Sequence, residues 1–112
     1  MIDSYTFGEF VIDGKLYKSN VKLIQDKATA CRYFENHIIK LDDFTDLVEQ
    51  KPEYIIIGTG ASGVVDVPQD IIDYIEEHNI KPIIEKTGDA VNTYNDLLKK
   101  GKKVCALMHN TC

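Results

Sequence analysis

The sequence predicts an α/β fold in which an antiparallel N-terminal section joins a parallel C-terminal part. In the second half, apolar runs at 54–57, 82–85 and 103–109 alternate with two stretches of helical periodicity. Short loops between such elements indicate two right-handed crossover units and therefore parallel strand pairing. In the first half, Asp13-Gly14 separates two runs of alternating apolar residues, which is typical of a β-hairpin.

The N-terminal elements follow from local patterns. Residues 5–24 have the composition of strands, and 20–24 either add a third strand or prolong the second. Residues 25–40 show no clean period, so we expect a long loop there. A short helix is predicted after Asp42 or Asp43, either of which could act as its N-cap, and it ends before Pro52.

The C-terminal elements are more regular. A buried strand at 54–57 is followed by a helix with Pro68 at its first position, which runs to about Asn79. The strand at 82–85 leads to a helix that we expect Thr87 to cap and Gly101 to close. The run at 103–109 is the third strand of this part.

Bulk composition limits the classes of partner. A chain of 112 residues with 44% hydrophobic residues is expected to form one domain, spanning 1–112. Its 18 acidic and 13 basic residues give a net charge of −5, which disfavours nucleic acid as a partner. The one basic cluster, within 99–103, is expected to offset a helix dipole.

The sequence also bears on location. No run approaches 18 apolar residues and the N-terminus has no basic leader, so we expect neither a membrane span nor a signal peptide. The three cysteines are odd in number and lack metal-type spacing. These features predict free thiols in a reducing cytoplasm.

The segment Gly58-Thr59-Gly60-Ala61-Ser62-Gly63 matches the dinucleotide-binding pattern G-x-G-x-x-G. That fingerprint requires a helix to begin at once, so that its N-terminus faces the pyrophosphate. Here a valine-rich stretch and Pro68 delay the helix, which argues against nucleotide binding although Glu85 has the spacing of a ribose-binding acid. A tight turn is the main interpretation, and a small anion held by loop amides with Thr59 or Ser62 stays open.

Other catalytic or metal patterns are weak. A nucleophile elbow needs glycine two residues after the serine, whereas Gly63 follows Ser62 directly. His109 and Cys112 alone do not make a metal site. Free cysteines are most often buried and inert, which argues against a cysteine hydrolase arrangement at Cys31. We therefore expect no metal, no cofactor and no identified catalytic residue.

A ligand site, if present, is expected beyond the carboxyl ends of the parallel strands, because loops diverge there. The candidate binding residues expected at this edge are Gly58, Thr59, Gly60, Ser62, Glu85 and His109. Arg32, Tyr33 and His37 lie in the irregular segment 25–40, which could fold over the edge.

The C-terminal half also resembles a known family. The resemblance rests on Gly58-x-Gly60 after a strand, on the helix begun by Pro68, and on a motif running through Thr87, Ala90, Tyr94-Asn95, Leu97, Gly101, Val104 and His109-x-Thr111-Cys112. These residues resemble the family of the adipogenesis-associated domain protein and the mitochondrial complex I (NADH:ubiquinone oxidoreductase) assembly factor. The resemblance implies a three-layer α/β fold around a mixed sheet, with protein binding and no established catalytic residues.

Three functional hypotheses follow from these observations. The first is a non-enzymatic protein-interaction or assembly module with a protein partner, no nucleic acid and no membrane. The second is a domain that binds a small anionic ligand at the glycine loop 58–63. The third, an unknown enzyme using the same edge, is the least favoured, and the oligomeric state is left open.

Overall fold

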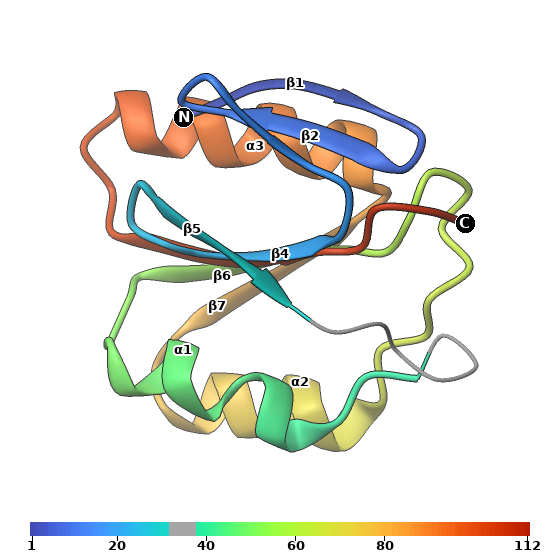
Figure 1. The fold of residues 1–112 in the computed structure, drawn as a ribbon. Coiled ribbons are helices and arrows are strands. Elements are labelled where there is room, and N and C mark those ends of the chain that lie inside the picture. Colours follow the sequence, from blue (N-terminus) through green and yellow to red (C-terminus); the bar gives the residue numbers. More distant parts are fainter. Residues whose placement is uncertain (32–37) are drawn as a thin grey trace.

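The computed structural model describes residues 1–31 and 38–112 (Figure 1). The N-terminal elements are β1 (Ile2–Thr6), β2 (Glu9–Ile12), β3 (Lys15–Tyr17), β4 (Asn20–Ile24), β5 (Lys27–Cys31) and a short 3-10 helix, η2 (Leu41–Asp43). The remaining elements are α1 (Thr45–Glu49), β6 (Tyr54–Gly58), α2 (Gln69–Glu77), β7 (Lys81–Glu85), α3 (Thr87–Lys99) and β8 (Val104–Met108).

A five-stranded mixed sheet forms the centre of the molecule, in the order β5-β4-β8-β6-β7. Strand β6 pairs in parallel with both β7 and β8, while β4 pairs antiparallel with β8 and β5. Strands β1, β2 and β3 form a separate antiparallel sheet. The predicted α/β class is confirmed, and the antiparallel section divides between two sheets.

Hydrophobic cores lie on both faces of the central sheet, because successive strand residues point to opposite sides. Ile55 and Ile57 of β6 pack into the core under α1 and α2, whereas Ile56 packs into the core beneath α3. Figure 1 shows the resulting layers, with α1 and α2 on one face and α3 with the small sheet on the other. This arrangement agrees with the three-layer architecture that the family resemblance implied.

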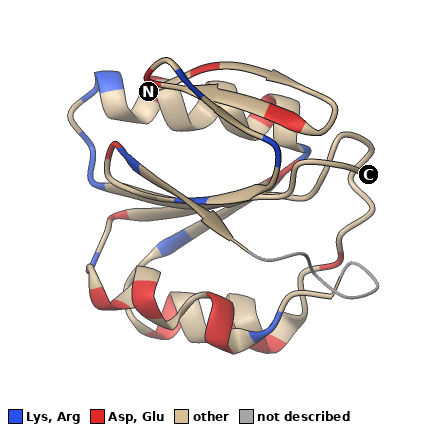
Figure 2. Cartoon of the chain, viewed as in Figure 1, with Lys and Arg blue, Asp and Glu red and all other residues tan. Residues whose placement is uncertain are grey.

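The layer of α1 and α2 is acidic. The two helices carry six acidic residues and no lysine or arginine. Figure 2 shows the acidic positions of this layer in red. The acidic residues are Asp46, Glu49, Asp70, Asp73, Glu76 and Glu77. Helix α3, on the other face, has Lys99 in its last turn.

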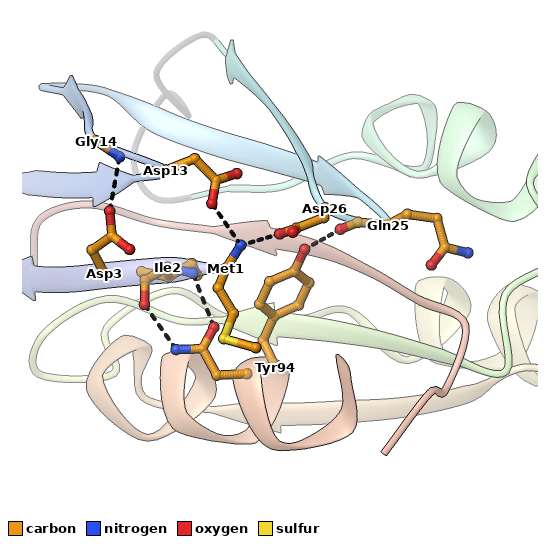
Figure 3. A network of polar contacts seen from close by, with 9 residues as sticks. Met1, Ile2, Asp3, Asp13, Gly14, Gln25, Asp26 and Tyr94 are labelled. Atoms are coloured by element: carbon orange, nitrogen blue, oxygen red, sulfur yellow. Dashed lines mark hydrogen bonds and ion pairs between the residues drawn. The ribbon is translucent and has the colours of Figure 1, made fainter. Parts of the chain in front are cut away.

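Polar contacts tie the small sheet to α3 (Figure 3). The Ile2 N–H donates to Asn95 Oδ1 at 2.9 Å, and Asn95 Nδ2 donates to the Ile2 carbonyl at 2.8 Å. The Tyr94 hydroxyl donates to the Gln25 carbonyl, and burial raises the pKa of Tyr94 above its usual range, with a further rise from nearby Asp26. Tyr94 is therefore a neutral donor that joins α3 to the turn after β4.

The structure corrects part of the N-terminal prediction. The Asp13-Gly14 hairpin is confirmed, with both residues at positive φ. Residues 25–40 were expected to form a loop, but 27–31 form β5, which pairs with β4. The turn before β5 has Gln25 at φ 55°, where glycine or asparagine would have signalled a hairpin.

The helix starts also differ from expectation. Asp43 Oδ2 accepts from the Lys40 N–H at 2.8 Å and so caps η2, while α1 begins only at Thr45. Pro68 is the N-cap of α2 rather than its first helical residue. Thr87 is the first residue of α3 and makes no cap, because its hydroxyl has other partners.

Strand β7 is an outermost strand of the central sheet, and Pro82 within it removes one hydrogen-bond donor from its free side. The Lys81 N–H and the Glu85 carbonyl both bond toward the β6 side, at Glu53 and Thr59. Because backbone groups alternate along a strand, those of Pro82 and Ile84 face outward. Pro82 has no N–H, so this edge presents fewer donors to another strand.

We predict that Pro82→Thr increases self-association, because it restores an outward N–H on an edge that carries exposed Ile84. Sedimentation velocity over a concentration series should show more dimer or larger species than the wild type shows. Pro68→Thr is the matched control, since it replaces a proline away from the sheet edge. Equal association of the two variants would contradict a protective role for Pro82.

Candidate functional site

The three parallel strands end side by side. Gly58 is in register with Glu85 on β7 and with Met108 on β8. The His109 N–H then donates to the Gly58 carbonyl at 2.9 Å. The structure therefore brings Gly58, Glu85 and His109 to one edge of the sheet, as the sequence predicted.

Most amides of the glycine loop are already engaged within the chain. The Thr59 N–H donates to the Glu85 carbonyl at 2.9 Å, and the Gly60 N–H donates to Thr87 Oγ1 at 2.9 Å. Two further loop amides, of Ala61 and Val64, donate to the carbonyls of Thr111 and Cys112, each at 3.3 Å. An anion held by these amides would have to displace the chain's own carbonyl groups.

The other candidate side chains at this edge also have structural partners. Thr59 Oγ1 donates to the Glu85 carbonyl at 3.1 Å, and Glu85 Oε1 accepts from Thr93 Oγ1 at 2.6 Å. His109 is buried, with Nε2 3.5 Å from Thr111 Oγ1, whereas Ser62 is exposed. Arg32, Tyr33 and His37, predicted to fold over the edge, lie outside the described residues.

The geometry also lacks the helix that dinucleotide binding requires. Helix α2 begins at Gln69, well after Gly63, so its N-terminus does not follow directly from the glycine turn. A pyrophosphate at the loop would therefore miss the favourable end of this helix. The delayed helix start that the valines and Pro68 predicted is confirmed.

The glycines instead permit close packing of the chain end. Gly60 has φ 104°, and a Cβ atom there would lie 2.5 Å from the Thr111 carbonyl oxygen. A Cβ atom on Gly58 would lie 2.7 Å from Met108 Sδ and 2.9 Å from Thr87 Oγ1. We call residues 109–112, which follow β8, the tail. The G-x-G part of the motif is therefore explained by close contacts, of Gly58 with Met108 and Thr87 and of Gly60 with the tail.

Thr87 is the residue at this edge whose role the sequence did not predict. It is fully buried, accepts a hydrogen bond from the Gly60 N–H, and donates to the His109 carbonyl at 2.8 Å. Its own N–H donates to the Gly60 carbonyl at 3.0 Å. A threonine that follows a strand is typical of a helix cap, so no sequence pattern indicated this bridging role.

Exposed apolar side chains flank the tail. Phe7 is 67% exposed at the β1–β2 turn, where the Gly8 N–H donates to the Asn110 carbonyl at 2.7 Å. On the other side of the tail, Val64 is 53% exposed, and its N–H bonds to Cys112. Ile38, 52% exposed, forms a bridge with Asp66 close to the same loop.

Burial raises the pKa of one titratable group beside the tail and of another within the core. Burial raises the pKa of Tyr5, whose hydroxyl donates to the Asn110 carbonyl at 3.0 Å, and nearby Cys112 adds to this rise. Burial likewise raises the pKa of the Cys105 thiol within the core. Among residues 1–31 and 38–112, no three potential metal ligands gather, and no helix is long and apolar enough to cross a membrane.

A three-layer α/β domain whose sheet edge is closed by its own tail is the class of protein that these features define. The chain belongs to the family described as "Protein of unknown function (DUF498/DUF598)", whose model matches residues 2–109.

Solved structures share this fold. A protein named MT938 is 26% identical, with a TM-score of 0.81, and the match covers 100% of this chain and 98% of that one. An outer membrane protein from Bartonella henselae is 24% identical, with a TM-score of 0.87 and coverage of 99% and 94%. The conserved hypothetical protein PH1505 from Pyrococcus horikoshii OT3 is 20% identical, with a TM-score of 0.86 and coverage of 100% and 99%. The last two likenesses concern the fold alone.

We predict that Gly60→Ala destabilises the protein by about 2–4 kcal/mol, because the added methyl meets the tail backbone at a strained positive φ. Gly88→Ala is the matched control, since it lies in α3 with open space around the new Cβ, and it should be neutral or stabilising by about 1 kcal/mol. Urea unfolding of the three proteins measures both values. Similar stabilities for the two variants would show that the tail does not need Gly60.

Thr87→Val is expected to lower the free energy of unfolding by about 2–4 kcal/mol, because it leaves two buried backbone groups without the hydroxyl. Thr87→Ser keeps the hydroxyl and removes a methyl group, so its loss should be about 1 kcal/mol. The difference in the free energy of unfolding between these two variants, measured in urea, gives the contribution of the two Thr87 hydroxyl hydrogen bonds. A valine variant as stable as the serine variant would argue against it.

Proposed function

We propose that the chain is a non-catalytic protein-interaction module that docks through a surface at the tail. We define this tail surface by the exposed side chains of Phe7 and Val64, which lie on the two segments that bond to the chain end, and of Ile38, which forms a bridge with Asp66 two residues after Val64. The observation that carries the proposal is that Phe7 and Val64, 67% and 53% exposed, stand on the two segments that bond to the chain end. Single exposed apolar residues are common, but a group of them around one segment is typical of a binding surface.

The backbone beneath these side chains is firmly held. The Gly8 N–H bonds to the Asn110 carbonyl, and Asn110 Nδ2 donates back to the Gly8 carbonyl at 3.1 Å. The Val64 N–H bonds to the Cys112 carbonyl on the other side of the tail. A surface presented on fixed backbone loses little conformational entropy on association, which favours affinity. Phe7, as an exposed aromatic side chain, suits the role of an anchor.

The polar chemistry of the edge gives less support to the anion-binding and enzymatic hypotheses. Of the loop amides that would hold an anion, those of Thr59, Gly60, Ala61 and Gly63 are engaged by the chain itself. Glu85 accepts from Thr93, and its charge would oppose an anion. The resemblance to the complex I assembly factor supports a protein partner, since such a factor acts by binding other proteins.

The proposal is tested by site-specific photo-crosslinking. A benzoylphenylalanine is placed at position 7 or 64 of the chain in its native cells, and crosslinked products are identified by mass spectrometry. The matched control position is Leu16, a 50% exposed apolar residue on β3. We expect one partner to crosslink from positions 7 and 64 and not from 16.

A second arm measures the same contact without crosslinking. Once the partner is identified, the double variant Phe7→Ser/Val64→Ser should weaken its binding at least tenfold, while Leu16→Ser should leave it unchanged. A tenfold loss is the least expected when two interface anchors are truncated. Equal crosslinking from all three positions, or equal effects of the variants, would refute docking at the tail surface.

A further inference from the structure

A hollow of about 620 Å³ lies at the end of the molecule opposite the tail surface. It is formed where α1 ends and the chain enters β6, together with the C-terminal half of α2. Its volume is in the range of small-ligand sites. The lining residues are Val48, Glu49, Lys51, Pro52, Glu53, Tyr74, His78 and Asn79.

The electrostatics of this hollow favour a cation. The C-terminal end of a helix carries partial negative charge, which basic side chains usually offset. Neither α1 nor α2 has a basic residue in its last turn, and α2 instead ends in Glu76 and Glu77. Glu49 at the end of α1 adds a further negative charge to the wall of the hollow.

Two other charged groups, Glu53 and Lys51, line the hollow and contribute to its net charge. Glu53 Oε2 accepts from the Lys103 N–H at 2.9 Å, which fixes this carboxylate beside the start of β6. Lys51 is an exposed cation and opposes a positively charged ligand. Its single charge is outnumbered by Glu49, Glu53 and the acidic end of α2.

An aromatic pair and apolar residues form the rest of the wall. The Tyr74 and His78 rings meet edge to face, with centroids 4.7 Å apart. His78 Nδ1 lies 2.8 Å from the Tyr74 carbonyl, so this nitrogen carries the proton and donates. Val48 and Pro52 are buried beneath the hollow and offer an apolar surface. Tyr74 can therefore contact a cation or an alkyl chain.

We propose that the hollow binds an alkyl ammonium or alkyl guanidinium group, either as a free small molecule or as a lysine or arginine side chain. Val48, Pro52 and Tyr74 would contact the alkyl part, while Glu49 and Glu53 face the charged head. The proposal does not depend on docking at the tail surface, which lies at the other end of the strands.

The test uses n-butylguanidinium as probe and its neutral isostere n-butylurea as control, with amide shifts followed by NMR at constant ionic strength. We expect saturable shifts confined to residues 48–53 and 74–79, with a Kd of about 1 mM or tighter for butylguanidinium. Butylurea should produce no saturable shift there. A short arginine peptide with blocked ends, compared with its alanine analogue, is titrated in the same way.

Variants separate the hollow from general negative charge. Glu49→Gln and Tyr74→Leu should each weaken butylguanidinium binding about threefold or more. Glu9→Gln removes the same charge on β2, outside the hollow, and should leave the Kd unchanged. Glu49 is exposed, so its variant is expected to fold even if Tyr74→Leu does not.

Each outcome decides the matter. If the arginine peptide shifts the same amides, the natural ligand is a protein side chain, and if only butylguanidinium does so, it is a free cation. The proposal is overturned if no saturable shift occurs up to about 10 mM, if butylurea shifts the same residues equally, or if Glu9→Gln weakens binding as much as Glu49→Gln.

Discussion

The hydroxyl group of Thr87 is the contact on which the carboxyl-end edge of the sheet depends. It accepts from the Gly60 N–H and donates to the His109 carbonyl, so it joins the loop after β6, the start of α3 and the tail after β8. Thr87 is fully buried, so water cannot replace either bond without opening the core. The segments that leave β6 and β8 and enter α3 therefore hold one another in place.

This contact explains why a sequence resembling a phosphate-binding loop serves another purpose. In dinucleotide-binding folds, glycines let a pyrophosphate approach backbone amides at the edge where ligands gather. Here the carbonyls of Thr111 and Cys112 accept hydrogen bonds from the Ala61 and Val64 N–H groups. Gly60, which has a positive φ and no Cβ, leaves room for the backbone of Thr111 and Cys112. The partial negative charge of the tail carbonyls occupies the position that a ligand's negative charge would take. The edge is closed by the chain itself, and the exposed side chains of Phe7 and Val64 flank it.

Local sequence patterns predicted the helices and strands in which buried apolar residues recur at regular spacing. Period-two and helical spacing located β6, β7, β8, α2 and α3, and Asp13-Gly14 located the hairpin. They missed β5, because its Lys-Ala-Thr-Ala-Cys sequence is weakly apolar and its turn uses Gln25 at positive φ. They could not assign β4 to the central sheet, since its partner β8 lies more than 80 residues later in the chain.

The candidate site was predictable only in its placement. The rule for parallel strands brought Gly58, Glu85 and His109 together, because it depends on topology and not on side-chain detail. The bridging role of Thr87 depends on three distant segments, and a single threonine after a strand is equally consistent with a helix cap. The exposure of Phe7 and Val64 also could not be predicted from the sequence, since apolar residues are expected to be buried.

The ends of α2 and α3 show why the hollow is distinct from an ordinary acidic surface. Both helices connect parallel strands, so their C-termini lie toward the same end of the sheet. Helix α3 ends with Lys99 and obeys the usual charge preference, whereas α2 ends with Glu76 and Glu77 and has no basic residue in its last turn. Helix α2 thus departs from the preference for basic residues at a helix C-terminus, while α3 follows it. Such a departure is expected where function, rather than stability, determines the residues. The C-terminal end of α2 lies at the hollow, so a bound cation would supply the positive charge that this helix end lacks.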